Sequence, residues 1–205
     1  MTSQHFSMPS STGFCLVLSA PSGTGKTTIS DSLLASDASI VRSISMTTRP
    51  RRTHEEEGED YYFATPDRFK ALIEEGEFLE WAEVHGYLYG TPRSPIDCII
   101  HKGQIALMVI DVQGGQSVKS ISPETVLVFL IPPSMDSLSN RLRQRRTEPE
   151  EMIQIRLKNA KVEMQHLPHY TYGVVNEDGK PQEAVDAIRA IISTERCRIS
   201  RWEAQ

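Results

Sequence analysis

Apolar side chains along the chain gather in short blocks that alternate with stretches of helical periodicity. Residues 105–110 and 126–131 are continuously apolar, as is typical of parallel strands covered on both faces. We expect strands near 14–19, 40–46, 105–110, 125–131 and 172–176, and helices near 26–36, 94–102, 134–146, 149–166 and 181–196. Because strands and helices alternate, the pattern predicts an α/β fold, a parallel sheet with helices on both of its faces.

The pattern changes between residues 45 and 93, where aromatic side chains, an acidic run and turn residues replace this alternation. One helix is well marked inside this stretch: Thr65 can cap it, Pro66 suits its first turn and Gly76 can end it. We interpret residues 45–93 as an inserted subdomain, and the arginine-rich residues around 141–156 as a second insertion.

Composition and charge narrow the class of protein. The 205 residues, 39% of them hydrophobic and 24% charged, predict one soluble globular domain after a loose tail over residues 1–13. The net charge of −5 argues against a nucleic-acid partner, and no apolar run reaches the ~18 residues of a membrane span. The tail lacks the apolar core of a signal peptide and the cysteines are widely spaced, so we expect reduced thiols and a cytoplasmic location.

The first predicted strand runs directly into a phosphate-binding loop. Residues 20–27 read APSGTGKT, against the pattern G-x-x-x-x-G-K-[S/T]. Backbone N–H groups of such a loop wrap phosphate oxygens, Lys26 would reach the β- and γ-phosphates, and the hydroxyl of Thr27 would hold Mg²⁺. Ala20 replaces the first glycine, a mild departure because an L-residue can reach the backbone angle required. The loop predicts a nucleoside triphosphate and magnesium as ligands.

A second group of motifs follows, SMTTRPRR over residues 45–52 and GEDYYF over residues 58–63. With these motifs and the phosphate-binding loop, the chain resembles the guanylate kinase family from about residue 14 to about residue 190. The resemblance implies an enzyme that transfers the γ-phosphoryl group of ATP to GMP or dGMP with Mg²⁺ as cofactor. It also implies a P-loop NTPase fold with three αβα layers and a five-stranded parallel sheet.

The resemblance further implies how the chain is divided. A single domain over residues 14–205 would have its core in residues 14–44, 94–136 and 165–196, a GMP-binding insertion in residues 45–93 and a lid in residues 137–164. The partners implied are ATP and GMP or dGMP, without nucleic acid or membrane, and a homodimer or a larger homo-oligomer stays open.

In the family, an Arg-x-x-Arg pair and two tyrosines bind the phosphate of GMP, and the matching residues here are Arg49, Arg52, Tyr61 and Tyr89. The chemistry agrees, because a dianionic phosphate favours forked guanidinium donors, to which phenol hydroxyls add neutral donors. Arg51 stays open as a substitute for Arg52. The acidic run over residues 55–60 is interpreted as mostly solvated, with some of it holding the nearby arginines in place.

The resemblance assigns recognition of the guanine base to Ser45, Glu80, Thr91 and Asp111. A carboxylate such as that of Glu80 accepts from the adjacent N1–H and N2–H₂ donors of guanine, whereas adenine presents an acceptor at N1. By strand alternation alone, Glu80 would be an exposed position. Asp111 follows a buried strand, where it can serve the base, the water shell of the metal ion or both, or be a turn acid. The family often has another acid two residues earlier, where this chain has Val109.

The remaining expectations from the resemblance concern ATP and the transfer of its phosphoryl group. The residues expected to bind ATP are Ala20, Pro21, Ser22, Gly23, Thr24, Gly25, Lys26, Thr27, Thr28 and Asn176. Asn176 would lie near the adenine, and a strand-end turn is its open alternative. The residues expected to act in catalysis, by compensating charge on the migrating group, are Lys26, Arg49, Arg141, Arg145 and Arg156. Arg143 is expected to face solvent, and Arg146 stands where the family usually has glycine.

Two alternatives to this activity stay open. A non-catalytic binding module of the same family would share the fold, but such modules typically have a degraded phosphate-binding loop, and here Lys26 and Thr27 are present. A kinase for another nucleoside monophosphate would share the loop and differ in the residues that face the base.

Overall fold

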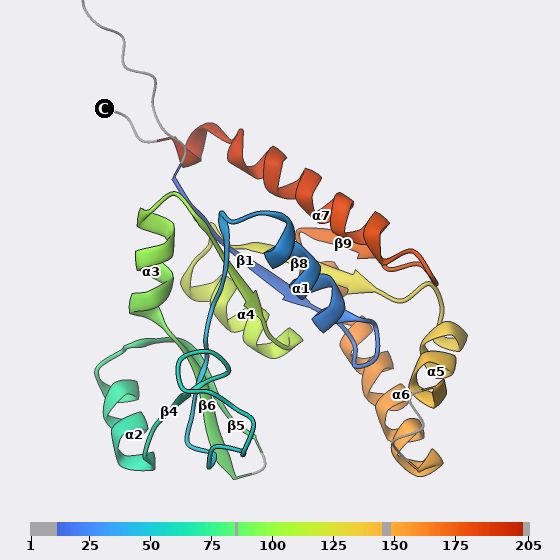
Figure 1. Cartoon of the computed structure of the whole chain (residues 1–205), viewed down its shortest axis with the longest axis horizontal. Coiled ribbons are helices and arrows are strands. Elements are labelled where there is room, and N and C mark those ends of the chain that lie inside the picture. The colour runs from blue at the N-terminus through green and yellow to red at the C-terminus, as the bar shows by residue number, and fades with distance from the viewer. Residues whose placement is uncertain (1–11, 85, 145–148, 203–205) are drawn as a thin grey trace, which may run out of the picture.

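The computed structural model describes residues 12–84, 86–144 and 149–202. At its centre lies a five-stranded sheet in the order β2-β7-β1-β8-β9, in which every neighbouring pair is parallel (Figure 1). The strands are β1 (Phe14–Ser19), β2 (Ile40–Arg42), β7 (Ile105–Val109), β8 (Val126–Ile131) and β9 (Tyr172–Val175). The predicted α/β fold with a five-stranded parallel sheet is therefore confirmed.

Helices cover both faces of this sheet; they are α1 (Lys26–Ser36), α3 (Arg93–His101), α4 (Val112–Ile121) and α7 (Pro181–Arg196). Successive side chains of a strand point to opposite faces. In β1, Phe14, Leu16 and Leu18 belong to the core under α1 and α7, whereas Cys15 and Val17 belong to the core under α3 and α4. Burying one such large apolar side chain stabilises the fold by about 1.5–3 kcal/mol, so the alternation in β1 contributes to both cores.

Helix α4 is absent from the elements that the sequence pattern predicts, because it contains two adjacent glycines, Gly114 and Gly115. The carboxylate of Asp111 caps the helix by accepting the backbone N–H of Gly114 at 2.8 Å. A Cβ atom placed on Gly115 would lie 2.7 Å from the hydroxyl oxygen of Tyr170. Gly115 therefore marks a close approach between packed elements, and the helix forms in spite of the glycines.

Residues between 46 and 92 contribute a second sheet of four strands, in the order β4-β3-β6-β5. Its strands are β3 (Met46–Thr47), β4 (Tyr62–Phe63), β5 (Phe78–Val84) and β6 (Tyr87–Pro92). The single strand expected over residues 40–46 is wrong, because β2 pairs with β7 in the large sheet whereas Met46 pairs with Gly90 in the small one. An extended pattern in the sequence does not specify which neighbour a strand pairs with, so the change of sheet left no signal.

The helix expected inside this stretch is confirmed as α2 (Pro66–Glu74). The side chain of Thr65 accepts the backbone N–H of Arg68 at 3.3 Å, and Gly76 follows the helix with a φ of 73°. The ring of Phe69 stacks on that of Phe78 with centroids 4.4 Å apart, which fixes α2 against β5.

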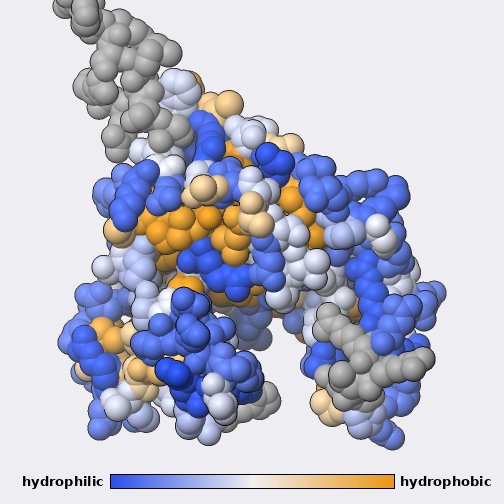
Figure 2. Space-filling view, in the orientation of Figure 1, coloured by the Kyte–Doolittle hydropathy of each residue, from blue (hydrophilic) through white to orange (hydrophobic). Residues whose placement is uncertain are grey.

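Two further helices, α5 (Met135–Gln144) and α6 (Glu150–Met164), pack against each other through a separate apolar core of Leu138, Leu142, Ile153 and Ala160. In Figure 1 this helix pair and the small sheet project from the same side of the large sheet. Figure 2 shows open space between the two projecting parts. The molecule is therefore open on this side, with the carboxyl end of β1 leading toward the opening.

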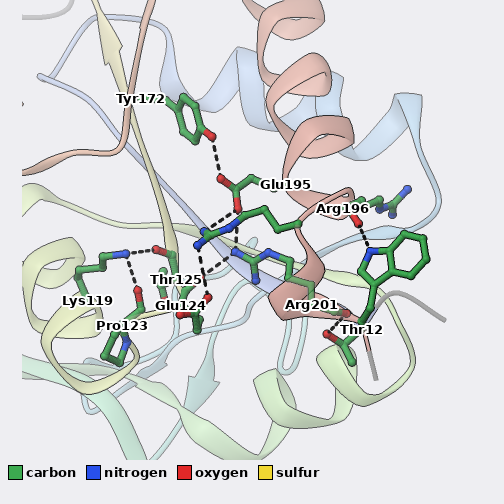
Figure 3. Close-up of polar contacts among 11 residues, drawn as sticks. Thr12, Lys119, Pro123, Glu124, Thr125, Tyr172, Glu195, Arg196 and Arg201 are labelled. Atoms are coloured by element: carbon green, nitrogen blue, oxygen red, sulfur yellow. Dashed lines mark hydrogen bonds and ion pairs between the residues drawn. The ribbon is translucent and has the colours of Figure 1, made fainter. Parts of the chain in front are cut away.

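The last described residues are tied to the large sheet by a buried ion pair (Figure 3). Arg201 donates to Oε2 of Glu195 at 2.9 Å, and the two side chains are only 5% and 4% exposed. The hydroxyl of Tyr172 donates to Oε1 of Glu195 at 2.7 Å, and the guanidinium of Arg201 lies 4.3 Å from the ring centroid of Phe14. The backbone N–H of Thr12 donates to the carbonyl of Arg201 at 2.7 Å. We call these five residues the C-terminal clamp.

We expect Glu195→Gln to lower the free energy of unfolding by about 3 kcal/mol near pH 7, because it leaves the charge of buried Arg201 without its partner. Burial alone would raise the pKa of Glu195, but hydrogen bonds from Tyr172 and Arg201 hold this pKa below its ordinary value. A carboxylate whose pKa is lower in the folded than in the unfolded protein stabilises the fold at pH values above its pKa in the unfolded chain. The difference between wild type and variant should therefore shrink as the pH falls below about 4, as measured by urea unfolding across this pH range.

Glu183→Gln provides the control, because Glu183 lies exposed on the same helix. Its substitution should change the free energy of unfolding by less than about 0.5 kcal/mol. Equal stability of wild type and Glu195→Gln at neutral pH would contradict the stabilising role of the C-terminal clamp.

Candidate functional site

The phosphate-binding loop leaves the carboxyl end of β1 and enters α1. Gly23 and Gly25 adopt φ angles of 91° and 99°, which glycine reaches without strain. Within the described part of the chain, no side chain caps the first turn of α1, so its N–H groups and the positive end of its dipole are available to an anion. The loop borders a cavity of about 270 Å³ lined by Ala20, Pro21, Ser22, Gly23, Gly25, Lys26, Thr27, Thr28, Asp111 and Glu163.

Lys26 lines this cavity, and its Nζ donates to the backbone carbonyl of Ile110 at 3.0 Å. Burial lowers the pKa of Lys26, while the carboxylates of Asp111 and Glu163 act in the opposite direction. The ammonium is thereby held beside the carboxyl end of β7. From there it can meet the phosphates of a nucleotide bound in the loop.

Three oxygen-bearing side chains of this cavity, Thr27, Asp111 and Glu163, suit a hard cation. Asp111 uses one carboxylate oxygen to cap α4, and Oε2 of Glu163 is buried without a hydrogen-bond partner among the described residues. Mg²⁺ takes oxygen ligands and usually keeps several waters and substrate phosphates. In the described ranges no group of three or more His, Cys, Asp or Glu side chains could hold a metal ion alone. The residues fit Mg²⁺ provided that phosphates and water complete its shell.

Glu163 is the residue of this cavity that the sequence analysis missed. It lies seven positions after Arg156 on α6, and residues at this spacing share a helix face. Arg156 donates to Oγ of Ser22 in the phosphate-binding loop at 3.2 Å, so the face of α6 that carries both residues is turned toward the loop. The helical spacing from Arg156 was the signal that could have identified Glu163.

Arg141 and Asn176 converge on the other side of the phosphate-binding loop. Nη1 of Arg141 and Nδ2 of Asn176 both donate to the carbonyl of Thr24, at 3.0 and 2.7 Å. Arg141 also donates to the carbonyl of Asn176 at 2.7 Å and to Asp178 at 2.8 Å. Beside them lies a cavity of about 470 Å³, lined by residues that include Arg141, Asn176 and Asn140. Asn176 thus fixes the loop, and the role expected near adenine stays a prediction.

The structure describes only some of the arginines that are expected over the triphosphate. Arg141 and Arg156 contact the phosphate-binding loop as described above, while Arg145 and Arg146 lie outside the described residues. Arg143 is exposed and paired with Glu150 at 2.7 Å, as expected of a solvent-facing side chain.

A third cavity, of about 410 Å³, lies where the small sheet faces α4 and is lined by residues that include Ser45, Tyr61, Glu80, Tyr89 and Asp111. Glu80 is half-buried, and burial raises its pKa, which the hydrogen bond from Thr91 partly opposes. Oγ1 of Thr91 donates to Oε1 of Glu80 at 2.6 Å, and Thr91 itself is fully buried. Thr91 therefore orients the carboxylate and does not line the cavity.

Next to Tyr61, which lines this cavity, Arg49 forms a largely buried ion pair with Glu55, with Nη2 and Oε1 2.7 Å apart. The guanidinium of Arg49 also lies 5.5 Å from the ring centroid of Tyr61, which meets the ring of Tyr89 edge to face. The Arg49 guanidinium and the backbone N–H of Arg52 lower the pKa of Glu55 to about 2. Glu55 is therefore the member of the acidic run that holds an arginine in place, whereas Arg52 itself is exposed.

Comparisons with known proteins agree with this geometry. The family model for guanylate kinase matches residues 13–195. The guanylate kinases of Thermotoga maritima and Myxococcus xanthus are 43% and 45% identical to the chain over 189 and 190 residues, and each match covers 92% of this chain and 90% of the relative. A crystal structure of guanylate kinase from Anaplasma phagocytophilum is similar with a TM-score of 0.74 at 38% identity, covering 96% of this chain and 93% of that one.

We expect Asn176→Asp to weaken ATP binding by about tenfold or more, because a carboxylate cannot donate to the Thr24 carbonyl and would repel it. The dissociation constant of ATP, measured by calorimetric titration, tests this. Asn140→Asp is the matched control, since it adds the same charge to the wall of the same cavity from an exposed position. Equal weakening in the two variants would show that the added charge, and not the lost hydrogen bond, causes the effect.

Proposed function

The chain belongs to the guanylate kinase family, and from that premise we propose how its residues divide the transfer of the γ-phosphoryl group of ATP to GMP. The chain is a phosphotransferase that gives ADP and GDP. The observation that carries the proposal is the position of Asp111, which lines both the cavity of the phosphate-binding loop and the cavity around Glu80. A donor in one cavity and an acceptor in the other would meet beside this residue.

On the ATP side, the backbone N–H groups of the loop would hold the β- and γ-phosphates, and Lys26 would exchange the Ile110 carbonyl for phosphate oxygens. Thr27 would hold Mg²⁺, which when bound compensates charge on the phosphates. The adenine would occupy the cavity beside Asn176, whose hydrogen bond to Thr24 keeps the loop in position.

On the GMP side, Glu80 would accept the N1–H and N2–H₂ donors of guanine while Thr91 fixes its orientation. Ser45 and Asp111 line the same cavity and would complete the contacts to the base. The phosphate would bind to the group of Arg49, Arg52, Tyr61 and Tyr89. Arg49 is suited to this because a guanidinium has five N–H donors, so it can bind phosphate while it keeps Glu55 as its partner.

The transfer itself would require the open space between the two projecting parts to close. Closure would bring Arg141, Arg145 and Arg156 over the triphosphate, where guanidinium groups compensate the charge that spreads over the migrating group. It would also exclude water, which could otherwise accept the phosphoryl group. No general base is needed, because the attacking phosphate oxygen of GMP is already anionic.

The proposal extends to dGMP, because no residue assigned here reads the 2′-hydroxyl. We also propose the division into a core, a GMP-binding insertion over residues 45–93 and a lid over residues 137–164, together with a cytoplasmic location. Among the helices of the described ranges, none has both the length and the apolar character needed to cross a membrane.

A substrate panel tests the proposed function. With ATP and Mg²⁺, turnover measured by coupled ADP release should be strong with GMP and dGMP and weak with AMP, CMP and UMP. Lys26→Ala should lose most of this turnover while it stays folded. Turnover with another monophosphate would overturn the assignment of the base, and ATP binding without any turnover would favour the non-catalytic binding module.

We expect Glu80→Gln to lower kcat/KM for GMP by about 10- to 100-fold and to reduce discrimination against AMP, because the amide replaces an acceptor with a donor. Steady-state kinetics with both monophosphates measure the ratio. Glu77→Gln, an exposed position just before β5, should leave kcat/KM unchanged. An unchanged GMP-to-AMP ratio in Glu80→Gln would mean that this carboxylate does not read the base.

A further inference from the structure

Glu163 on α6 lies at the phosphate-binding loop without a role in the assignments above. It lines the loop cavity together with Lys26, Thr27 and Asp111. Burial raises the pKa of Glu163, while the Lys26 ammonium and the backbone N–H of Ser22 act in the opposite direction. Its Oε2 atom is buried and makes no hydrogen bond to any described residue.

A buried carboxylate oxygen that makes no hydrogen bond is costly, because its desolvation is not offset. Pairing with Lys26 does not remove this cost, since its Nζ donates to the Ile110 carbonyl and forms no ion pair with Glu163. Asp111, the other carboxylate of the cavity, already uses one oxygen to accept the Gly114 N–H. Of these two carboxylates, Glu163 on α6 is therefore the one with a buried oxygen that lacks a donor among the described residues.

We propose that Glu163 is a positioning residue for the magnesium–nucleotide complex, and that its free carboxylate oxygen accepts hydrogen bonds from water in the shell of a Mg²⁺ held at Thr27. This inference rests on the proposed function. Mg²⁺ usually keeps several of its waters when it binds through phosphates, and those waters need acceptors. Partners in this outer position typically change metal affinity by about 10- to 100-fold.

The placement of Glu163 on α6 gives the contact a second consequence. Arg156, two turns earlier on the same helix face, donates to Oγ of Ser22 at 3.2 Å. One face of α6 thus carries both a contact to the loop and an acceptor for the metal's water. Binding of Mg²⁺ with nucleotide would therefore favour one position of α6 over the loop, which links metal binding to the position of the lid.

The test compares ADP binding with and without the metal ion. Calorimetric titration of ADP, once with Mg²⁺ and once with EDTA, gives two dissociation constants. We call the ratio of the value in EDTA to the value in Mg²⁺ the metal benefit, which is the factor by which Mg²⁺ tightens ADP binding. In Glu163→Gln this benefit should fall by about tenfold or more. Metal-free ADP should bind as tightly as to wild type or more tightly, since a negative charge next to the phosphates is gone.

Glu151→Gln is the matched control, because Glu151 lies exposed on the same helix, and it should keep the full benefit. An unchanged benefit in Glu163→Gln would overturn the proposal. So would equal weakening of ADP with and without Mg²⁺, which indicates that Glu163 only holds α6 in place. If Glu163→Gln does not fold, Glu163→Asp is tested instead. It keeps the negative charge but moves the carboxylate oxygens away from the cavity, so the effect of Mg²⁺ on ADP affinity should again fall.

A double variant separates this inference from the proposed function. Thr27→Val should itself reduce the benefit of Mg²⁺, and adding Glu163→Gln should reduce it by less than the product of the single effects, because both act on one metal ion. Fully multiplicative effects would contradict a shared metal. If wild type turns over GMP but Glu163→Gln keeps the metal benefit, only the role of Glu163 fails. If wild type gains no affinity from Mg²⁺, the magnesium site of the proposed function fails first.

Discussion

The parallel pairing of β1 with β7 is the constraint on which the rest of the site depends. Its register sets Leu18 opposite Val109, so the phosphate-binding loop and Asp111 leave the sheet at the same edge. Two contacts then join these segments: Lys26 donates to the Ile110 carbonyl at 3.0 Å, and Oγ of Ser19 donates to the carbonyl of Asp111 at 3.2 Å. Ligands of open α/β sheets bind at the carboxyl ends of the strands for the same reason, since the loops that meet there come from separate parts of the chain.

Both projecting parts meet this edge through charged groups that the fold has already organised. On one side, the Arg49–Glu55 ion pair holds a guanidinium beside the ring of Tyr61, and on the other, Arg141 is held by the Thr24 carbonyl and by Asp178. Ordering long side chains costs conformational entropy. Because contacts within the protein already hold these arginines, less of that entropy remains to be lost when a nucleotide binds.

The large sheet, the phosphate-binding loop and α2 could be predicted because each depends on local sequence: apolar blocks, a glycine pattern and a Thr65 cap. The features that the sequence did not predict depend on contacts between segments that are distant in the chain. Gly115 is required by the approach of Tyr170, so a glycine pair that locally disfavours a helix lies inside α4. The division of residues 40–46 between two sheets is set by pairing partners. Glu163 escaped notice because its surroundings come from the loop, 141 positions earlier at Ser22, although its spacing from Arg156 was visible.

The order of the sheet has a consequence for how the chain folds as it is made. Strand β1 is synthesised first but sits in the centre of the sheet, and its partner Ile105 follows Phe14 only after most of the first half of the chain. At a synthesis rate of about 5–20 residues per second, the apolar β1 would wait roughly 5–20 s for β7, and longer for β8. The C-terminal clamp can close only after all five strands of the large sheet are synthesised, since Arg201 follows β9 and contacts Phe14 and Thr12. Until β7 is synthesised, β1 has neither of its neighbours in the sheet, so its apolar side chains are exposed on the nascent chain and are prone to aggregation.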